Sequence, residues 1–427
     1  MKNLILILIL LAGTNLLFAQ IAVKKAEVLV SPRLVEKVIT VGGQNADISG
    51  FNNQSIQYAI DAVAKNGGTV KLMPGLFKLN APVKMKSNVK LIGSGRETIL
   101  QRGAGVQTRF IQDADYGELK LTVENPDGFE PGMKVQVTDR DQSSCWNVST
   151  AYITDIQDDT IFIDTHLIRD YRSDRDGYVS NASSVIEVIE AENVHISNLT
   201  ADGNRAKNFL ADGCNSAGIL VFKSKMVTVD NVHVKDFNGE GISWQITENV
   251  TIRNSEISGS GNTGMHPGTG SPFTVIENNN VHHNDNDGLF ICWRVYKSTV
   301  TNNQFHNNGR FGICTGHKDT DVTFTGNHIY ENGSDGVNLR GERESNAPHR
   351  NTFVKNIIEN NGTKGSGYGF AINSPARDLV LKENIFRSNG KKTQKAAVYV
   401  TANGLKPELI DNKIESHPEK DIILENK

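Results

Sequence analysis

Short apolar segments follow glycine at a fixed interval in the second half of the chain. Gly264, Gly288, Gly312 and Gly336 stand 24 residues apart, and each opens a segment in which apolar and polar residues alternate. Alternation at period 2 is typical of β-strands, and a fixed period of this size indicates stacked repeats whose neighbours complete one core. Because the turns are rich in Asn and Gly, leucine-rich and helical solenoids are disfavoured.

The turns carry a second regular pattern built on Asn. In the clearest copies one Asn precedes an apolar residue by two positions and another follows it by three, as in Asn303-Gln-Phe305-His-Asn-Asn308. Stacked at one place per coil, such side chains can form ladders that satisfy the backbone groups of the turns. The interval lengthens once, between Gly336 and Gly369, so the coil that carries Glu342 should have a longer loop.

The first part of the chain predicts a helix followed by strands. Residues 52–68 have apolar side chains at helical spacing, with Asn52 or Asn53 as a capping residue and Gly67-Gly68 as the stop. A Gly-Gly-Thr-Val strand, a Pro-Gly turn and a Ser-Asn-Val-x-Leu-x-Gly-x-Gly strand follow, up to residue 95. This order resembles the opening of the pectate-lyase-like superfamily. The resemblance implies an all-β, right-handed parallel β-helix (a solenoid) with an N-terminal capping helix, and its members are mostly polysaccharide lyases, glycoside hydrolases and uronate epimerases, with some phage tailspikes.

The chain divides into four predicted segments. Residues 1–19 are typical of a secretory signal peptide, with an early Lys, an apolar run and Ala before Gln20. Residues 20–99 should form the cap and the first coils, and residues 181–427 the main parallel β-helix. Between them, residues 100–180 lose the repeat and contain short β-prone runs separated by turns, which predicts a small β-rich, antiparallel insertion.

Composition limits which classes of partner and which cellular compartment are expected. The formal net charge is −3, and no segment after the signal has 18 consecutive apolar residues, so neither a nucleic acid partner nor membrane insertion is expected. We therefore expect an exported, periplasmic or secreted protein. The four Cys residues show no compact framework spacing, so disulfides stay open and the fold should not depend on them.

The place of a residue in its strand predicts which side chains face the core. Counting from the strand glycine, odd positions are apolar and should face inward: Ile242, Trp244, Met265, Leu289, Ile291, Ile313, Val337 and Leu339. Even positions should face solvent: Ser243, Gln245, His266, Gly268, Phe290, Cys292, Cys314, Gly316, Asn338, Arg340, Ala371 and Asn373. Small residues in the middle of this outer face predict a shallow trough, which suits an extended chain ligand.

Cations and imidazoles gather on and beside the predicted trough. Arg294, Lys318 and Arg340 could neutralise a uronate carboxylate and so ease removal of the proton next to it. His266 or His317 could accept that proton, because imidazole titrates near neutral pH. These residues make a polysaccharide or oligosaccharide the expected partner.

One departure from the repeat singles out His266. Pro267 follows it inside a central strand, where proline cannot donate a ladder hydrogen bond, and such breaks in a regular pattern are expected at functional sites. Trp293, Asn338 and Gln245 complete the predicted substrate contacts, although Trp293 could equally be buried beneath the insertion.

Three functions stay open at this point. The favoured hypothesis is an exported enzyme that cleaves an acidic, uronate-containing polysaccharide by β-elimination. A glycoside hydrolase would instead use Asp319 and Glu342 as an acid and base pair, and a third alternative is a non-catalytic glycan-binding protein. Structural roles compete with all of these, because Lys318 and Glu342 could form only a cross-strand ion pair and Asp319 could shape a turn.

Motifs of individual families within the superfamily do not decide the reaction. Polygalacturonase-like hydrolases would show Gly-His-Gly, which Gly316-His317-Lys318 matches only in its first two residues, and alginate epimerases of this fold would show Asp-Pro-His, which is absent. No metal site is predicted. Calcium is the alternative, with acidic turn residues as ligands, although solvated turn positions account for them better: Asp285, Asp287 and Asp335.

Overall fold

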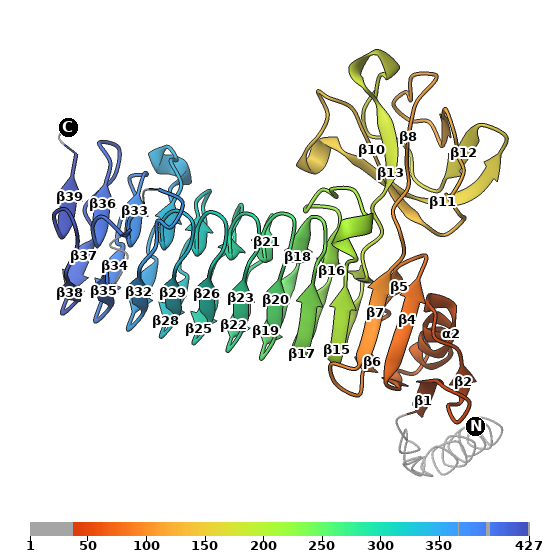
Figure 1. Cartoon of the computed structure of the whole chain (residues 1–427), viewed down its shortest axis with the longest axis horizontal. Helices are drawn as coiled ribbons and strands as arrows, with labels where there is room; N and C mark the ends of the chain where they lie inside the picture. Colours follow the sequence, from red (N-terminus) through yellow and green to blue (C-terminus); the bar gives the residue numbers. More distant parts are fainter. Residues whose placement is uncertain (1–36, 366, 390–392, 426–427) are drawn as a thin grey trace, which may run out of the picture. The chain divides into compact units, whose positions relative to one another are not determined.

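The computed structural model describes residues 37–365, 367–389 and 393–425. The predicted signal peptide, residues 1–19, lies outside the described residues, as do residues 20–36. The described chain forms coils that stack in sequence order from β1 (Lys37–Gly42) to β39 (Ile422–Leu424), as Figure 1 shows. Each regular coil has three strands, two in one large sheet and one in a second sheet. The predicted parallel β-helix is therefore confirmed.

The second sheet carries the predicted site residues, and we call it the site sheet. Its strands pair in parallel, one coil apart, so that Met265, Leu289, Ile313, Val337 and Phe370 share one column. The interval between the strand glycines is thus the length of one coil. The 11 strands are β5 (Val83–Lys84), β14 (Ile186–Ile189), β16 (Ala217–Phe222), β18 (Glu240–Gln245), β21 (Met265–Gly268), β24 (Leu289–Phe290), β27 (Ile313–Thr315), β30 (Val337–Leu339), β33 (Phe370–Ile372), β36 (Val398–Val400) and β39.

The large sheet supplies the other two strands of each coil. Its pairs are parallel, and short turns whose residues often have positive φ join its strands. Besides β1, its strands are β2 (Ile48–Ser49), β3 (Gly68–Leu72), β4 (Gly75–Leu79), β6 (Val89–Ile92), β7 (Thr98–Arg102), β15 (Glu192–Asp202), β17 (Lys225–Lys235), β19 (Glu248–Arg253), β20 (Glu256–Ser258), β22 (Val275–Glu277), β23 (Asn280–His282), β25 (Thr299–Thr301), β26 (Gln304–His306), β28 (Thr323–Thr325), β29 (His328–Tyr330), β31 (Thr352–Val354), β32 (Ile357–Glu359), β34 (Val380–Lys382), β35 (Ile385–Arg387), β37 (Glu408–Ile410) and β38 (Lys413–Glu415).

The predicted capping helix is α2 (Asn53–Ala64). The Asn52 side chain accepts a hydrogen bond from the Ser55 amide at 2.9 Å, which satisfies one free donor of the first turn. The apolar stripe of α2 is buried and joins the continuous core that runs between the sheets of the coils: Ile56, Ala59, Ile60 and Val63. The helix thus covers apolar side chains that the first coil would otherwise leave exposed.

Two ladders of buried Asn side chains run along the turns. In the first, Asn279, Asn303, Asn327, Asn356 and Asn384 each pass a side-chain hydrogen bond to the next coil at 2.9–3.0 Å. Each Nδ2 in this ladder also donates to a backbone carbonyl of the coil before it, as Asn327 does to Val300. The second ladder contains Asn284, Asn308, Asn332 and Asn361 and ends on Gln394. The ladder prediction is confirmed.

The segment between β7 and β14 forms a separate antiparallel sheet with its own core. Buried side chains such as Phe110, Val135, Ile153 and Tyr171 pack together there. The sheet order is β8 (Gln107–Arg109), β13 (Tyr178–Asn181), β10 (Lys134–Thr138), β11 (Ser149–Gln157), β12 (Thr160–Ile163) and β9 (Lys120–Thr122), with short helices η1 (Cys145–Asn147) and η2 (Ser173–Arg175) between strands; two more short helices, η3 (Arg205–Lys207) and η4 (Glu344–Asn346), lie in loops of the coils.

The insertion contacts the outer face of the site sheet at β14 and β16. Lys134 Nζ lies 3.0 Å from Glu187 Oε1, and both side chains are almost fully buried. The Tyr152 hydroxyl also donates to Glu187, and Trp146 of η1 packs on Phe222 with ring centroids 6.1 Å apart. A buried ion pair of this kind needs its partners held in place, so these contacts fasten the insertion across the first strands of the site sheet.

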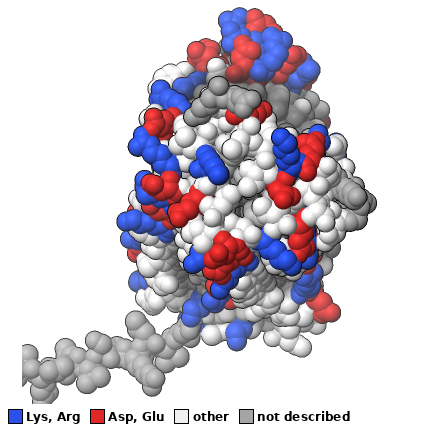
Figure 2. Space-filling view, turned by 90° about the vertical axis from the view of Figure 1, so that its left-hand side faces the viewer, with Lys and Arg blue, Asp and Glu red and all other residues white. Residues whose placement is uncertain are grey.

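Surface charge is mixed in sign. Figure 2 shows Lys and Arg side chains interspersed with Asp and Glu on the face that it presents. Within the part of the chain that the structure describes, no helix is both long and apolar enough to span a bilayer.

Replacing Asn327 with Ala should destabilise the fold. The buried Asn327 side chain accepts hydrogen bonds from the amide and the side chain of Asn303 and donates two more, so its loss leaves buried polar groups without partners. We expect a loss of about 2–4 kcal/mol in the free energy of unfolding, measured by urea denaturation. The exposed Gln304→Ala is the control, with a change within about 0.5 kcal/mol. Equal losses in the two variants would contradict a stabilising ladder.

Candidate functional site

The outer face of the site sheet is more buried than the sequence pattern predicts. The odd positions face the core as expected. At the even positions, however, Ser243, Gln245, His266 and Cys314 are each exposed by 4% or less, so the prediction that they face solvent is wrong. One cause is the loop before β16, where the Gly213 carbonyl accepts a hydrogen bond from Ser243 at 2.6 Å.

The second cause is that long side chains lie over the small residues of the predicted trough. A methyl group added at Gly268 would lie 2.4 Å from Gln245 Oε1, and one at Gly316 would lie 2.6 Å from Arg340 Nε. The glycines therefore make room for neighbouring side chains rather than for a ligand. Gln245 is fully buried, donates to Ser243 at 3.1 Å and does not reach the surface.

His266 lies in a buried cluster at the start of β21. Its Nδ1 is 3.5 Å from Oε1 of Glu240, and its ring packs edge-on against Phe290 at 5.1 Å. Glu240 is held in turn by the Asn262 side chain and the Thr263 amide, at 2.9 and 3.0 Å. The imidazole and the carboxylate thus form a charged pair away from water.

The charge of His266 follows from this pairing. Burial alone would lower the pKa of His266, but the neighbouring Cys292 thiol and the Glu240 carboxylate outweigh burial and raise it to about 10. At neutral pH the ring is therefore an imidazolium, which cannot accept a proton. His266 fits the role of a buried counter-ion better than that of a base.

Arg340 connects the buried cluster to the strand ends. Its Nη1 donates to the Ile291 carbonyl at 2.8 Å, its Nη2 lies 3.6 Å from Asp319 Oδ2, and its guanidinium carbon lies 4.6 Å from the centre of the Phe290 ring. Asp319 is fully buried and accepts hydrogen bonds from the amides of Gly316 and Val295. Burial raises the pKa of Asp319 against the opposing effect of Arg340. Asp319 thus shapes the turn after β27, as one of its two predicted roles required.

A second, exposed cluster lies at the ends of β24, β27 and β30. His317 Nδ1 is 3.4 Å from Glu342 Oε2, and each side chain is about one-fifth exposed (21% and 19%). The His317 ring stacks on Trp293 with centroids 4.9 Å apart, and the Arg294 guanidinium lies 5.9 Å from the Trp293 ring. Trp293 is 44% exposed, so it is not buried beneath the insertion.

The backbone at this cluster forms left-handed turns. Trp293 and Arg294 both have φ of 66°, and among the described residues they are the only adjacent pair of non-glycine residues with positive φ. Lys318, at the equivalent turn of the next coil, has φ of 57°. Bulky side chains adopt this region at a cost of roughly 1 kcal/mol or more each. The same turn recurs in earlier coils, at Lys223, Ile246 and Thr269, so it belongs to the repeat.

The cations of the exposed cluster have no carboxylate partner. Across the described residues, neither the Arg294 nor the Lys318 side chain lies within ion-pair distance of Asp or Glu, whereas Glu342 pairs with His317. The alternative in which Lys318 and Glu342 form a cross-strand ion pair is therefore wrong. The longer loop after Glu342 contains η4, and its Asn346 carbonyl accepts the Lys318 amide at 2.7 Å.

The structure thus separates the predicted site residues into two groups. His317, Lys318, Glu342, Trp293 and Arg294 meet at the surface. The remainder lie buried or half-buried behind them: His266, Asp319, Arg340, Asn338 and Gln245. Asn338 donates to Asp335 at 2.8 Å and is 8% exposed, so its amide is already engaged.

Sequence reasoning missed Glu240, the partner of His266. Glu240 stands directly before the strand glycine of an earlier coil, a place that later coils fill with Thr263, Asp287, Phe311 and Asp335. An acidic residue there recurs without a fixed role, so its position alone did not mark it. Only the tertiary contact identifies Glu240, because Glu240 and His266 lie 26 residues apart in sequence and in neighbouring coils.

The acidic turn residues do not fit a metal ion. Asp285 pairs with Arg205, Asp287 with Arg310, and Asp335 accepts from Asn338. Nowhere in residues 37–365, 367–389 or 393–425 do three or more His, Cys, Asp or Glu side chains gather as a metal site.

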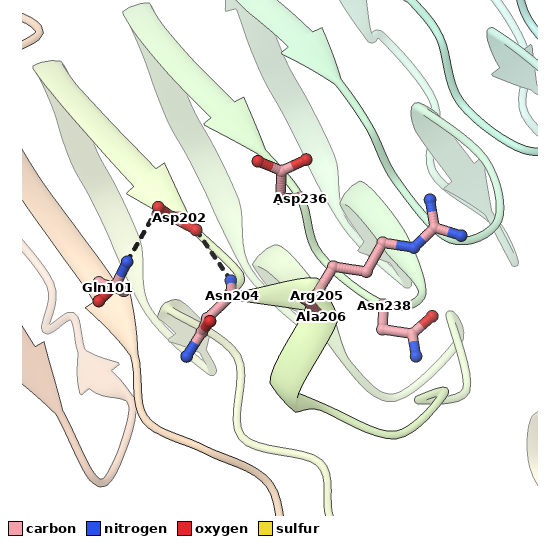
Figure 3. A pocket seen from close by; sticks show the side chains of 7 residues that line it. All are labelled: Gln101, Asp202, Asn204, Arg205, Ala206, Asp236 and Asn238. Atoms are coloured by element: carbon pink, nitrogen blue, oxygen red, sulfur yellow. Dashed lines mark hydrogen bonds between the residues drawn. The ribbon is translucent and has the colours of Figure 1, made fainter.

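A polar pocket of about 580 Å³ lies apart from both clusters, at the ends of β15 and β17 (Figure 3). Asp202 lies in it and accepts hydrogen bonds from Gln101 and the Asn204 amide, and Lys235 Nζ lies 3.1 Å from it. None of the predicted site residues lines this pocket. Lys235 also lies 3.3 Å from Asp236, so the two carboxylates of this pocket share one lysine.

The Glu240 and His266 pair predicts a pH-dependent effect of His266→Gln on stability. Because the folded-state pKa of His266 lies above the ordinary value of 6.5, its protonation stabilises the fold fully below pH 6.5, and this contribution is lost as pH rises through about 10. We expect His266→Gln to cost a few kcal/mol, roughly, at pH 6 and clearly less at pH 10.5, measured by urea unfolding. The exposed His283→Gln is the control and should change little at either pH. The same cost for His266→Gln at both pH values would refute the charged pair.

Solved structures with the same arrangement belong to proteins of several activities. The A-module of the mannuronan C-5 epimerase AlgE4 from Azotobacter vinelandii matches with a TM-score of 0.56 at 19% identity, over 88% of this chain and 93% of that one. PfbA, a surface adhesin of Streptococcus pneumoniae, matches with a TM-score of 0.55 at 16% identity, over 87% and 88%. At these identities the likeness extends to the fold alone. No curated protein sequence matches this chain.

A family model settles the class of the chain. The model of the right-handed β-helix region matches residues 178–353 and 247–414, which together span more than half of the 427 residues. The matched range includes both clusters and the coils that repeat at 24 residues. The chain therefore belongs to the right-handed parallel β-helix family, with the fold of the pectate-lyase-like superfamily that its opening residues resemble.

Proposed function

We propose that this protein acts on an acidic, uronate-containing polysaccharide, and that it cleaves the polysaccharide by β-elimination at the exposed cluster. The observation that supports this most is the meeting of His317, Glu342, Trp293, Arg294 and Lys318 at one edge of the site sheet. This set holds a base, a carboxylate to orient it, an aromatic surface and two cations without carboxylate partners. Each of the five side chains is at least partly accessible.

His317 is the proposed base. Glu342 faces its Nδ1 at 3.4 Å, which favours the tautomer with the proton on Nδ1 and leaves Nε2 free to accept another. The stack on Trp293 restricts rotation of the ring. A carboxylate that orients an imidazole is a recurring arrangement in proton transfer at neutral pH.

Arg294 and Lys318 are the proposed contacts of the substrate carboxylate. A proton next to a carboxylate becomes easier to remove when cations neutralise the charge that develops on the carboxylate oxygens. Both side chains are exposed. Lys318 directly follows the base in sequence, and Arg294 lies in the coil before it. The exposed Trp293 ring offers a surface on which an apolar face of a sugar can stack.

The proposed reaction balances without water or a cofactor. His317 Nε2 takes the proton from the carbon next to the carboxylate, and the electron pair of that C–H bond forms a carbon–carbon double bond. The bond between the next carbon and the glycosidic oxygen breaks, and the proton held by His317 passes to the leaving oxygen. The products are an unsaturated uronate end and a new hydroxyl end.

The alternatives differ in what the site residues allow. A hydrolase would need Asp319 as well as Glu342, but Asp319 is fully buried and hydrogen-bonded, so it would not reach a glycosidic oxygen. Epimerisation begins with the same proton removal, and the fold likeness to the epimerase A-module keeps this reaction as an outcome of the test. The fold likeness to a surface adhesin keeps glycan binding without turnover as another outcome of the test. Export to the periplasm or the medium is part of the proposal.

The replacement His317→Gln should abolish formation of unsaturated product. Purified protein is incubated with polygalacturonate, alginate or hyaluronan, and unsaturated ends are followed by ultraviolet absorbance. Loss of the base should lower the rate by about 10²–10⁴-fold, while His283→Gln, at an exposed turn, keeps the wild-type rate. New reducing ends without absorbance would contradict elimination and favour hydrolysis. Exchange of substrate hydrogen with heavy water, without cleavage, would point to epimerisation.

Removing either exposed cation should weaken substrate binding. We expect Lys318→Ala to raise KM by about 10-fold or more, because a charged contact to the substrate carboxylate is lost. Lys297→Ala is a matched control, since Lys297 is also exposed and has a left-handed backbone, with φ of 49° against 57° at Lys318. The KM of each variant is measured at low and at moderate salt concentration. An unchanged KM in Lys318→Ala would remove this lysine from the site.

A further inference from the structure

Two cysteines from distant parts of the chain meet where the insertion contacts the coils. Cys145 begins η1 in the insertion, and Cys214 lies in the loop before β16, 69 residues later. Their sulfur atoms are 2.7 Å apart. A disulfide bond of about 2.05 Å requires only a small further approach.

The two backbones are held together without help from the sulfur atoms. Asp212 accepts a hydrogen bond from the Cys145 amide at 2.7 Å through one carboxylate oxygen and from the Cys214 amide at 3.1 Å through the other. The Asn215 side chain donates to the Cys145 carbonyl at 3.1 Å. One carboxylate thus positions both cysteines, and their proximity does not depend on a single side-chain rotamer.

The two thiols differ in a way that suits stepwise oxidation. Cys145 is exposed, whereas Cys214 is buried with 4% of its surface accessible. The hydrogen bond with Cys214 lowers the pKa of Cys145 against the effect of burial, and the same contact together with burial raises the pKa of Cys214. The exposed thiolate is the natural first nucleophile toward a disulfide oxidant.

We propose that Cys145 and Cys214 form a disulfide that fastens the insertion to the loop covering the outer face of the site sheet. With oxidised glutathione as the oxidant, the Cys145 thiolate attacks one of its sulfur atoms and releases one glutathione thiol. The Cys214 thiolate then attacks Cys145 Sγ and releases the second. Two protein thiols lose two protons and two electrons, and one glutathione disulfide becomes two thiols.

The bond reinforces contacts that already join the same two segments. Trp146, next to Cys145, packs on Phe222, and Gln136 donates to the Leu210 carbonyl at 2.8 Å in the loop that carries Cys214. The loop covers Ser243 at the end of the buried face that holds His266. Closing a chain segment of this length restricts the unfolded state and holds the insertion in place. This inference is independent of the proposed reaction.

The remaining cysteines provide an internal control. Cys314 is fully buried beside Arg340, and Cys292 stands in the column of Gly268 rather than in that of Cys314. Neither lies within hydrogen-bond distance of another sulfur among the described residues. Both should therefore stay thiols under conditions that oxidise the first pair.

The test counts thiols in the full chain. The protein is equilibrated with oxidised glutathione, denatured, alkylated and measured by intact mass and by peptide mapping. We expect two of the four cysteines to be protected, with one peptide pair joining Cys145 to Cys214. Cys145→Ser and Cys214→Ser should each abolish that peptide, whereas Cys292→Ser should keep it. A reductant should lower the melting midpoint of the oxidised wild-type protein by about 5 °C and leave Cys145→Ser unchanged.

Several results would overturn the proposal. Four alkylated cysteines after oxidation would do so, as would a bond between other cysteines. Glutathione bound to Cys145 without formation of the joined peptide would show that Cys214 does not complete the second step. Because the assay reads covalent structure, its outcome does not depend on whether the chain cleaves a polysaccharide.

Discussion

The stacking of parallel coils is the constraint on which the rest of this structure depends. Neighbouring strands in a sheet lie about 4.8 Å apart, so equivalent residues of successive coils touch one another along the whole stack. A buried Asn can satisfy its amide only if the next coil offers an acceptor at the same place, as Asn303, Asn327 and Asn356 do. The same rule fills the core, where Phe324 and Phe353 stack with ring centroids 4.1 Å apart. The repeat period of the sequence follows from this stacking.

The candidate site lies on the outer face and at the edge of this stack. On the outer face, a glycine in one coil leaves space that a long side chain from a neighbouring coil occupies, so Arg340 lies over Gly316 and Gln245 over Gly268. These buried side chains hold Phe290, His266 and Asp319 behind the surface. At the strand ends a left-handed turn recurs from coil to coil, at Ile246, Thr269, Arg294 and Lys318. The exposed cations and the imidazole are presented from this edge.

Much of the fold could be predicted from sequence, because the repeat is a local signal. The 24-residue interval, the inward-facing apolar positions and the cap of α2 all follow from residue type and spacing, and each is confirmed. The exposure of the outer face was not predictable in the same way. Burial of Ser243 and His266 depends on a loop near residue 213 and on Glu240, contacts that no periodicity encodes.

The sequence named candidate site residues, and the structure sorts them into a buried and an exposed group. Spacing placed His266 and His317 in neighbouring regions, but only tertiary contacts separate a buried imidazolium beside Glu240 from an accessible imidazole beside Glu342. Asp319 is a further example, because the sequence around a carboxylate in a turn does not show whether that carboxylate is buried or solvated. Burial and pairing decide which titratable groups can take part in chemistry.

We infer that the exposed cluster, and not the buried one, holds the substrate. The most direct test is a crystal structure of the His317→Gln variant with a uronate oligosaccharide. We expect a sugar ring against Trp293, with its carboxylate contacting Arg294 and Lys318 and with the carbon next to that carboxylate facing residue 317. An oligosaccharide bound in the polar pocket at Asp202, or along another face of the coils, would contradict it.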